Sequence, residues 1–147
     1  MLTMRSPAID PVLPPWPDDR LSFAPLPASG DDGFPQAFLL ELRGVVYRLT
    51  MAVYYRDPDI VLNPAYANAI FELPNTAKGL SLNLAVEYEE RPADGRMIGS
   101  QRVVLDMPMA FGPLRIRFRR VRVAQANLAG PGSFGSELVA EVAVSDG

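Results

Sequence analysis

Residues 37–55 read AFLLELRGVVYRLTMAVYY, and this stretch decides the fold. Apolar side chains recur at every second position from Phe38 to Leu42, and the same period resumes at Val45 and continues to Tyr55. A two-residue period is typical of a β-strand with one buried face. Because Gly44 tolerates the positive φ of a two-residue turn, the pattern predicts a β-hairpin that reverses at residues 43–44. A lone hairpin is only marginally stable in water, so its apolar face requires further strands.

Three segments downstream of the hairpin carry a similar signature. Residues 80–88 alternate apolar and polar side chains, residues 96–107 return after a turn at residues 92–95, and residues 136–144 form the last candidate strand. Residues 67–73 suit a short strand or a single helical turn, and residues 108–113 are predicted to be a break. With no helical periodicity, the pattern predicts an all-β fold, an antiparallel β-sandwich or partly open β-barrel of about 6–8 strands.

We expect the core to combine the apolar face of the hairpin with the strands that cover it. Alternate side chains of each strand point to the same face of a sheet, so the buried set can be read from the period. The predicted core is Phe38, Leu40, Leu42, Tyr47, Leu49, Met51, Leu82, Leu84, Val86, Ile116 and Phe118.

The most unusual composition lies in residues 114–123, which read LRIRFRRVRV. Phe118 shares a face with the apolar residues before it, whereas Val121 and Val123 are out of phase with it by one residue. A one-residue slip turns every later side chain to the other face, so one face stays apolar only if a bulge at residues 119–120 absorbs the extra residue. The opposite face then carries a row of guanidinium groups.

Three interpretations of this arginine row stay open. It is a solvated edge that resists aggregation, a site that neutralises nucleic-acid phosphates, or a surface that faces acids of a neighbouring strand or subunit. Candidate acids for the third interpretation are Glu87, Glu89, Glu90 and Glu141. Nucleic-acid surfaces usually combine a larger basic patch with stacking aromatics, so a nucleic-acid partner is not expected. We predict contacts with protein partners through Arg115, Arg117, Arg120 and Arg122.

Residues 1–36 form a proline-rich extended N-terminal arm, distinct from the single β-domain predicted for residues 37–147. Eight of the fifteen prolines lie in the arm, and proline at this density blocks helices and central strands. The arm nevertheless carries large apolar side chains that a solvated linker would not need. It either folds back over its own sheet or lies across a neighbouring subunit. We predict that residues 1–33 dock on another chain, and that the partner contacts Trp16, Phe23 and Phe34.

Composition excludes several functional classes. The absence of cysteine rules out disulfides and thiolate metal sites, and the absence of histidine removes the commonest general base and transition-metal ligand. A net charge of −3 gives no global attraction to nucleic acid or membranes. No stretch approaches the ~18 apolar residues of a membrane helix, and no signal peptide is evident, so we expect synthesis in the cytoplasm and no membrane association.

The sequence also lacks a convincing catalytic group. Lys78 is the only lysine, and no G-x-S-x-G motif accompanies it. The pairs Asp31-Asp32 and Asp57-x-Asp59 are explained by turn chemistry and lack the spacing of a calcium loop. We therefore expect neither an enzyme nor a bound metal or cofactor.

The run Phe38-x-Leu40-x-Leu42-x-Gly44-x-x-Tyr47-x-Leu49, which opens a small acidic β-domain, resembles the start of small β-rich baseplate plug proteins of tailed bacteriophages. The resemblance covers residues 38–49, and residue 43 is arginine where those proteins tend to have Asp or Asn. Such proteins are non-enzymatic and seal or bridge the tail tube and baseplate. The resemblance implies a structural role in a phage tail or similar particle, a virion location, and other structural subunits as partners.

These observations predict a non-catalytic structural subunit of a large assembly that joins its neighbours through the arm, loops and sheet edges and is oligomeric within the particle. The alternative is a carbohydrate- or nucleic-acid-binding β-module, for which Trp16, Tyr54, Tyr55 and Tyr66 are available for stacking. A particle subunit would occur in fixed stoichiometry with other proteins. A binding module would be a monomer with one aromatic-lined groove.

Overall fold

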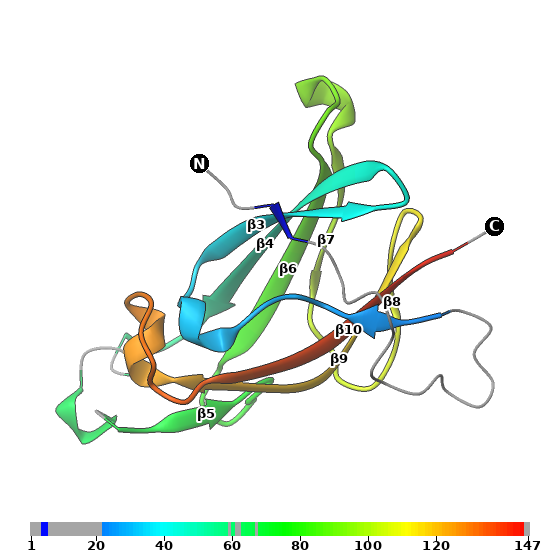
Figure 1. Ribbon diagram of the computed structural model, residues 1–147. Helices are drawn as coiled ribbons and strands as arrows, with labels where there is room; N and C mark the ends of the chain where they lie inside the picture. The colour runs from blue at the N-terminus through cyan, green and yellow to red at the C-terminus, as the bar shows by residue number, and fades with distance from the viewer. Residues whose placement is uncertain (1–3, 6–21, 59, 61–62, 67, 146–147) are drawn as a thin grey trace.

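The computed structural model describes residues 4–5, 22–58, 60, 63–66 and 68–145. Two sheets pack face to face around one core (Figure 1). Sheet A has the strand order β1 (Met4–Arg5), β3 (Gln36–Leu42), β4 (Val45–Tyr54), β6 (Ser81–Tyr88) and β7 (Met97–Arg102). Sheet B has the order β2 (Ala24–Pro25), β10 (Glu137–Val144), β9 (Leu114–Ala124) and β5 (Ile70–Glu72), and β8 (Met109–Phe111) also pairs with β9.

The predicted all-β sandwich is confirmed, because the two sheets are antiparallel apart from the short parallel pair β1–β3 and do not close into a barrel. The ten strands of the described residues exceed the predicted 6–8. Two of them, β1 and β2, have only two residues each, and β8 lies where a break was expected. In the part of the chain that the structure describes, the connections contain four short 3-10 helices, which are η1 (Gly30–Asp32), η2 (Pro64–Tyr66), η3 (Ala93–Gly95) and η4 (Gln125–Leu128).

The predicted hairpin is strands β3 and β4, joined by a two-residue turn at Arg43 and Gly44. Both turn residues have positive φ, 50° and 78°, as the type I′ turn that matches strand twist requires. Leu42 is opposite Val45 and Leu40 is opposite Tyr47. This register places Phe38, Leu40, Tyr47, Leu49 and Met51 on one buried face.

The core lies between that face and sheet B. Strand β6 pairs with β4, so Leu84 stands opposite Met51, and both side chains are fully buried. Strand β9 supplies Ile116 and Phe118 from the other sheet, and these are also fully buried. All predicted core residues are buried except Leu42, which is partly buried at the edge of the cluster.

The bulge expected in the arginine-rich strand is present. Ala140 of β10 is opposite Phe118 and Val139 is opposite Arg120, so Arg119 has no counterpart. Val121 is thereby turned to the same face as Phe118, and only 2% of its surface is exposed. The prediction of one apolar and one guanidinium face of β9 is confirmed.

The prediction that the arm docks on another chain needs correction, because the described part of the arm packs on its own domain. Phe23 and Phe34 are only 2% and 4% exposed, so neither side chain can bind another chain as predicted. Ala24 and Pro25 pair with β10, and the backbone N–H of Leu26 donates to the carbonyl of Ala140. Within the described residues, the part of the arm from residue 22 to residue 36 packs on the sandwich that begins at β3. Trp16 lies outside the described residues.

A buried amide fixes the end of the arm to the loop before β10. Asn127 is fully buried, and its side-chain NH2 donates to the carbonyls of Gly130 and Gly132 at 3.2 and 3.1 Å. The carboxylate of Asp31, from η1 in the arm, accepts a hydrogen bond from the backbone N–H of Ser136 at 3.0 Å. These bonds satisfy buried polar groups that would otherwise destabilise the fold.

The core assignment predicts a large effect at Leu84. We expect Leu84→Ala to lower the free energy of unfolding by about 2–5 kcal/mol, because a buried side chain is replaced by a cavity. Urea denaturation measures the change. Val104→Ala, at a position 47% exposed, is the control and should cost under about 0.5 kcal/mol. Equal costs for the two variants would contradict the core assignment.

Candidate functional site

The arginine row lies on the outer face of sheet B, but its central member is buried. Arg117 is 2% exposed and forms an ion pair through Nε with Glu141, which is fully buried. The guanidinium of Arg119 also lies 3.4 Å from the Glu141 carboxylate. The Arg117 guanidinium stacks on the ring of Phe23, 4.1 Å from its centre. This cation–π contact attaches the arm to the outer face of the sheet.

The other members of the row are engaged with their own chain. Arg120 and Arg122 lie 3.4 and 3.5 Å from the Glu137 carboxylate. Arg122 is also 3.8 Å from Glu72. The Arg115 guanidinium donates to the carbonyls of Gly112 and Leu114 at 2.8 and 2.9 Å. Of the three interpretations of the row, pairing with acids of neighbouring strands describes these contacts best.

Arg117 cannot contact a partner as predicted, because the arm and the sheet bury it. Partner contacts of Arg115, Arg120 and Arg122 stay a prediction. Among the candidate acids only Glu141 faces the row. Glu137 and Glu72 were not foreseen as its partners, although the alternation of β10 already placed Glu137 and Glu141 on one face.

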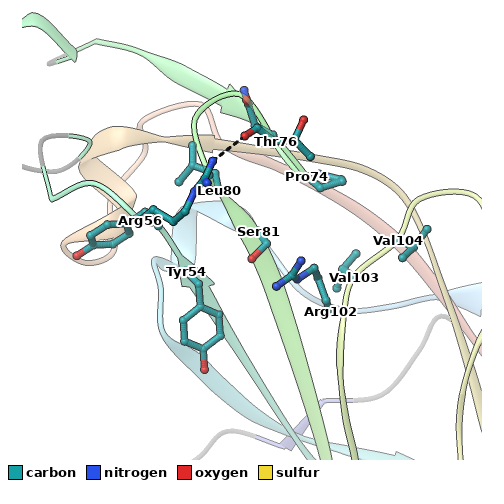
Figure 2. A pocket seen from close by; sticks show the side chains of 12 residues that line it. Tyr54, Arg56, Pro74, Thr76, Leu80, Ser81, Arg102, Val103 and Val104 are labelled. Carbon is teal, nitrogen blue, oxygen red and sulfur yellow. Dashed lines mark hydrogen bonds between the residues drawn. The ribbon is translucent and has the colours of Figure 1, made fainter.

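A second candidate site is a groove of about 520 Å³, here called the Tyr54 groove (Figure 2). It lies where β4 ends, β6 begins and β7 ends, and the loop of residues 74–79 forms one wall. Strand β6 pairs with both β4 and β7, which sets Tyr54 opposite Ser81 and brings Arg102 alongside. The polar and aromatic lining residues include Tyr54, Tyr55, Arg56, Asn75, Ser81 and Arg102.

The Tyr54 groove assembles two of the aromatic residues expected for stacking in a binding module. Tyr54 and Tyr55 are 59% and 42% exposed. Tyr66 lies apart from them, packed edge-on against Phe71 and beneath the ammonium of Lys78, 4.9 Å from its ring centre. No motif in the sequence marks the two arginines of the groove, since Arg56 follows the hairpin and Arg102 belongs to a distant strand.

The hairpin of β6 and β7 projects beyond the rest of the sandwich (Figure 1). Residues 89–96, here called the β6–β7 tip, join its strands and carry five charged side chains. Arg48 donates two hydrogen bonds to the Glu89 carboxylate, at 2.9 and 3.1 Å. The Arg91 guanidinium lies 3.8 Å from the centre of the Tyr88 ring, which packs against Tyr47. The tip is therefore braced on β4.

The Arg48–Glu89 pair shifts the pKa values of both side chains at the base of the tip. The hydrogen bonds and charge of Arg48 lower the pKa of Glu89 below its usual range, and Glu89 raises the pKa of Arg48. Burial raises the pKa of the Tyr47 hydroxyl, and the neighbouring Tyr88 adds to the effect. Glu89 is consequently anionic and Tyr47 neutral at physiological pH.

Within the described residues, no group of three or more Asp and Glu side chains is arranged to hold a metal ion. None of the helices in this part of the chain is long and apolar enough to span a membrane. No family model matches the sequence, and comparisons with curated proteins and with solved structures find no similar protein.

The buried ion pair predicts a non-additive mutational effect. We expect Glu141→Leu to lower the free energy of unfolding by about 3–5 kcal/mol, because the buried Arg117 loses its counter-charge. The double variant Arg117→Met with Glu141→Leu should recover most of that loss. Urea denaturation gives both values, with the exposed Glu137→Gln as a control that costs under about 1 kcal/mol. Additive losses in the double variant would contradict the pairing.

The low pKa of Glu89 predicts a pH-dependent contribution to stability. A depressed folded-state pKa stabilises the fold above the unfolded pKa, and this contribution is lost as the pH falls through the folded value. The melting temperature of wild type should exceed that of Glu89→Gln at pH 7, and the gap should close in strong acid. Thermal melts from pH 7 to pH 2 measure it. Glu90→Gln, a neighbouring exposed control, should show no such gap.

Proposed function

We propose that the protein is a non-catalytic structural subunit of a large assembly, of the kind found in the tail or baseplate of a phage or elsewhere in a virion. The observation that carries the proposal is the projecting, braced β6–β7 tip (Figure 1). A protrusion of this kind reaches past the body of a subunit and contacts a neighbour.

The β6–β7 tip is suited to docking because its conformation is already fixed. The Arg48–Glu89 pair and the Arg91–Tyr88 contact hold its base before any partner binds. A preorganised segment loses little conformational entropy when it docks. Its charged side chains of both signs supply electrostatic complementarity, and Met97, 58% exposed at the base, supplies apolar contact area.

Exposed apolar side chains at a sheet edge support further contacts between subunits. Ile70, the first residue of the edge strand β5, is 45% exposed, and Phe134 is 49% exposed. The two lie near each other, since a Cβ at Gly135, the residue after Phe134, would be 3.8 Å from the Cδ1 of Ile70. Edge strands and exposed apolar side chains are common sites of protein association. The resemblance of residues 38–49 to phage baseplate proteins supports a phage particle as the setting.

The test uses gradient sedimentation of extracts from the cells that make the protein. We expect the wild-type protein to sediment with particles of megadalton size, in a fixed ratio to other structural proteins. Replacing residues 90–94 with Asn-Gly, a two-residue turn that keeps Tyr88 opposite Arg96, should leave the melting temperature nearly unchanged and move the protein to the monomer fraction.

The control is Lys78→Gln, an exposed substitution on the loop at the opposite end of β6, which should leave incorporation intact. Wild-type protein found only in the monomer fraction would overturn the proposed function. Full incorporation of the shortened variant would show that the β6–β7 tip is not the docking element.

A further inference from the structure

The Tyr54 groove has an electrostatic character that differs from that of the whole molecule. The chain has a net charge of −3, yet the described residues lining this groove include two arginines and no carboxylate. A local cluster of one sign in a concave site concentrates ligands of the opposite sign. The groove is therefore suited to a small anion rather than to a cation.

Arg56 is held in place before any ligand binds. Its guanidinium donates to the carbonyl of Thr76 at 3.1 Å, as Figure 2 shows. Gly79 makes room for the side chain, since a Cβ at residue 79 would lie 2.4 Å from the Arg56 Nε. Gly79 also has φ +67°, which favours glycine. The remaining N–H groups of Arg56 are thus presented from a fixed position.

Arg102 is the second cation of the groove, and its N–H groups are available to a ligand. In the part of the chain that the structure describes, its guanidinium has no hydrogen-bond or ion-pair partner. Figure 2 shows it turned toward Ser81, across the start of β6. A guanidinium presents N–H donors in a planar fork that matches a carboxylate or phosphate in a bidentate contact.

The aromatic and hydroxyl groups indicate what the anion is attached to. Tyr54 presents an exposed ring on the outer face of sheet A beside Ser81. Thr76 and Asn75 add a hydroxyl and an amide on the loop wall. An aromatic face packs on the apolar face of a ring, and hydroxyl and amide groups exchange hydrogen bonds with ring hydroxyls.

We propose that the Tyr54 groove binds an acidic saccharide, a sugar whose ring carries a carboxylate. The carboxylate lies between Arg56 and Arg102, and the ring packs on Tyr54. The volume of about 520 Å³ falls in the range of small-ligand sites, which suits a ligand of one to three sugar rings.

The charge balance favours a saccharide over a nucleic acid. Affinity for nucleic acid depends on the number of phosphates neutralised, and two arginines neutralise too few to hold a strand at physiological salt. The net negative charge of the molecule further opposes a long polyanion. One carboxylate per ligand matches the two cations without requiring an extended basic surface. This binding role is independent of the proposed assembly role.

The test is isothermal titration of the full-length protein with a panel of carboxylate-bearing oligosaccharides, namely trigalacturonate, a glucuronate disaccharide, a mannuronate trimer and sialyllactose. Maltotriose is the neutral probe and oligo-dT the nucleic-acid probe. We expect at least one acidic oligosaccharide to bind at 150 mM salt more tightly than either probe. No binding across the acidic panel, or tighter binding of oligo-dT, would overturn the proposal.

Variants then locate the site on the groove. We expect Arg102→Gln and Tyr54→Ala each to weaken binding about 10-fold, while Tyr54→Phe, which keeps the ring, retains it. Arg120→Gln, on the outer face of the other sheet, removes the same charge and should leave the affinity unchanged. Near-UV circular dichroism checks that each variant is folded. If Arg102→Gln and Arg120→Gln weakened binding equally, the loss of affinity would come from the change in net charge, and the assignment of the site to the Tyr54 groove would be wrong.

Discussion

Strand β9 must accommodate Arg119, a residue with no counterpart on β10, and the rest of sheet B depends on that bulge. Strands β10, β5 and β8 all pair with β9, so the orientation of its side chains sets theirs. If strand β9 alternated strictly through Arg119, with no bulge, Val121 and Val123 would face solvent, and Arg120 and Arg122 would enter the core. The bulge keeps one face continuously apolar against the hairpin of β3 and β4.

The outward arginines have a second consequence, which is the attachment of the arm. A guanidinium that is covered by protein requires a counter-charge, because an unpaired buried charge is strongly destabilising. Glu141 supplies that charge to Arg117 from the neighbouring strand, and Phe23 covers the pair. The same short segment pairs with β10 through Ala24 and Pro25. The arm from residue 22 onward is therefore a structural part of the sandwich rather than a separate extension.

Local patterns in the sequence predict the parts of this fold that local physics determines. The hairpin, its turn at Arg43, the buried side chains of β6 and the bulge of β9 all follow from a two-residue period. The surface on which Phe23 packs does not follow from such a period. A proline-rich segment can dock on its own domain or on a neighbour, and no local pattern distinguishes the two. The short strand β8 was missed because prolines flank it.

The Tyr54 groove is likewise only partly predictable from local sequence patterns. Tyr54 and Tyr55 were recognised as aromatic residues available for stacking, but nothing near them in the sequence indicates Arg102. The residues meet only because β6 pairs with both β4 and β7, and that pairing is a property of the whole sheet. The predicted partner contact of Arg117 was wrong for the same reason. Its burial depends on Phe23 and Glu141, which are far from it in the sequence.

The β6–β7 ribbon places the two proposed surfaces at its opposite ends. Strand β6 runs from Ser81 in the Tyr54 groove to Tyr88 at the base of the tip, which separates them by roughly 23 Å at the usual rise per residue. A ligand in the groove and a subunit at the tip therefore do not compete for space. Because the ladder of β4, β6 and β7 is continuous between them, docking of the tip would hold the groove in a fixed orientation at the far end of β6. A subunit anchored at one end could then present a saccharide-binding surface at the other without any change in its own fold.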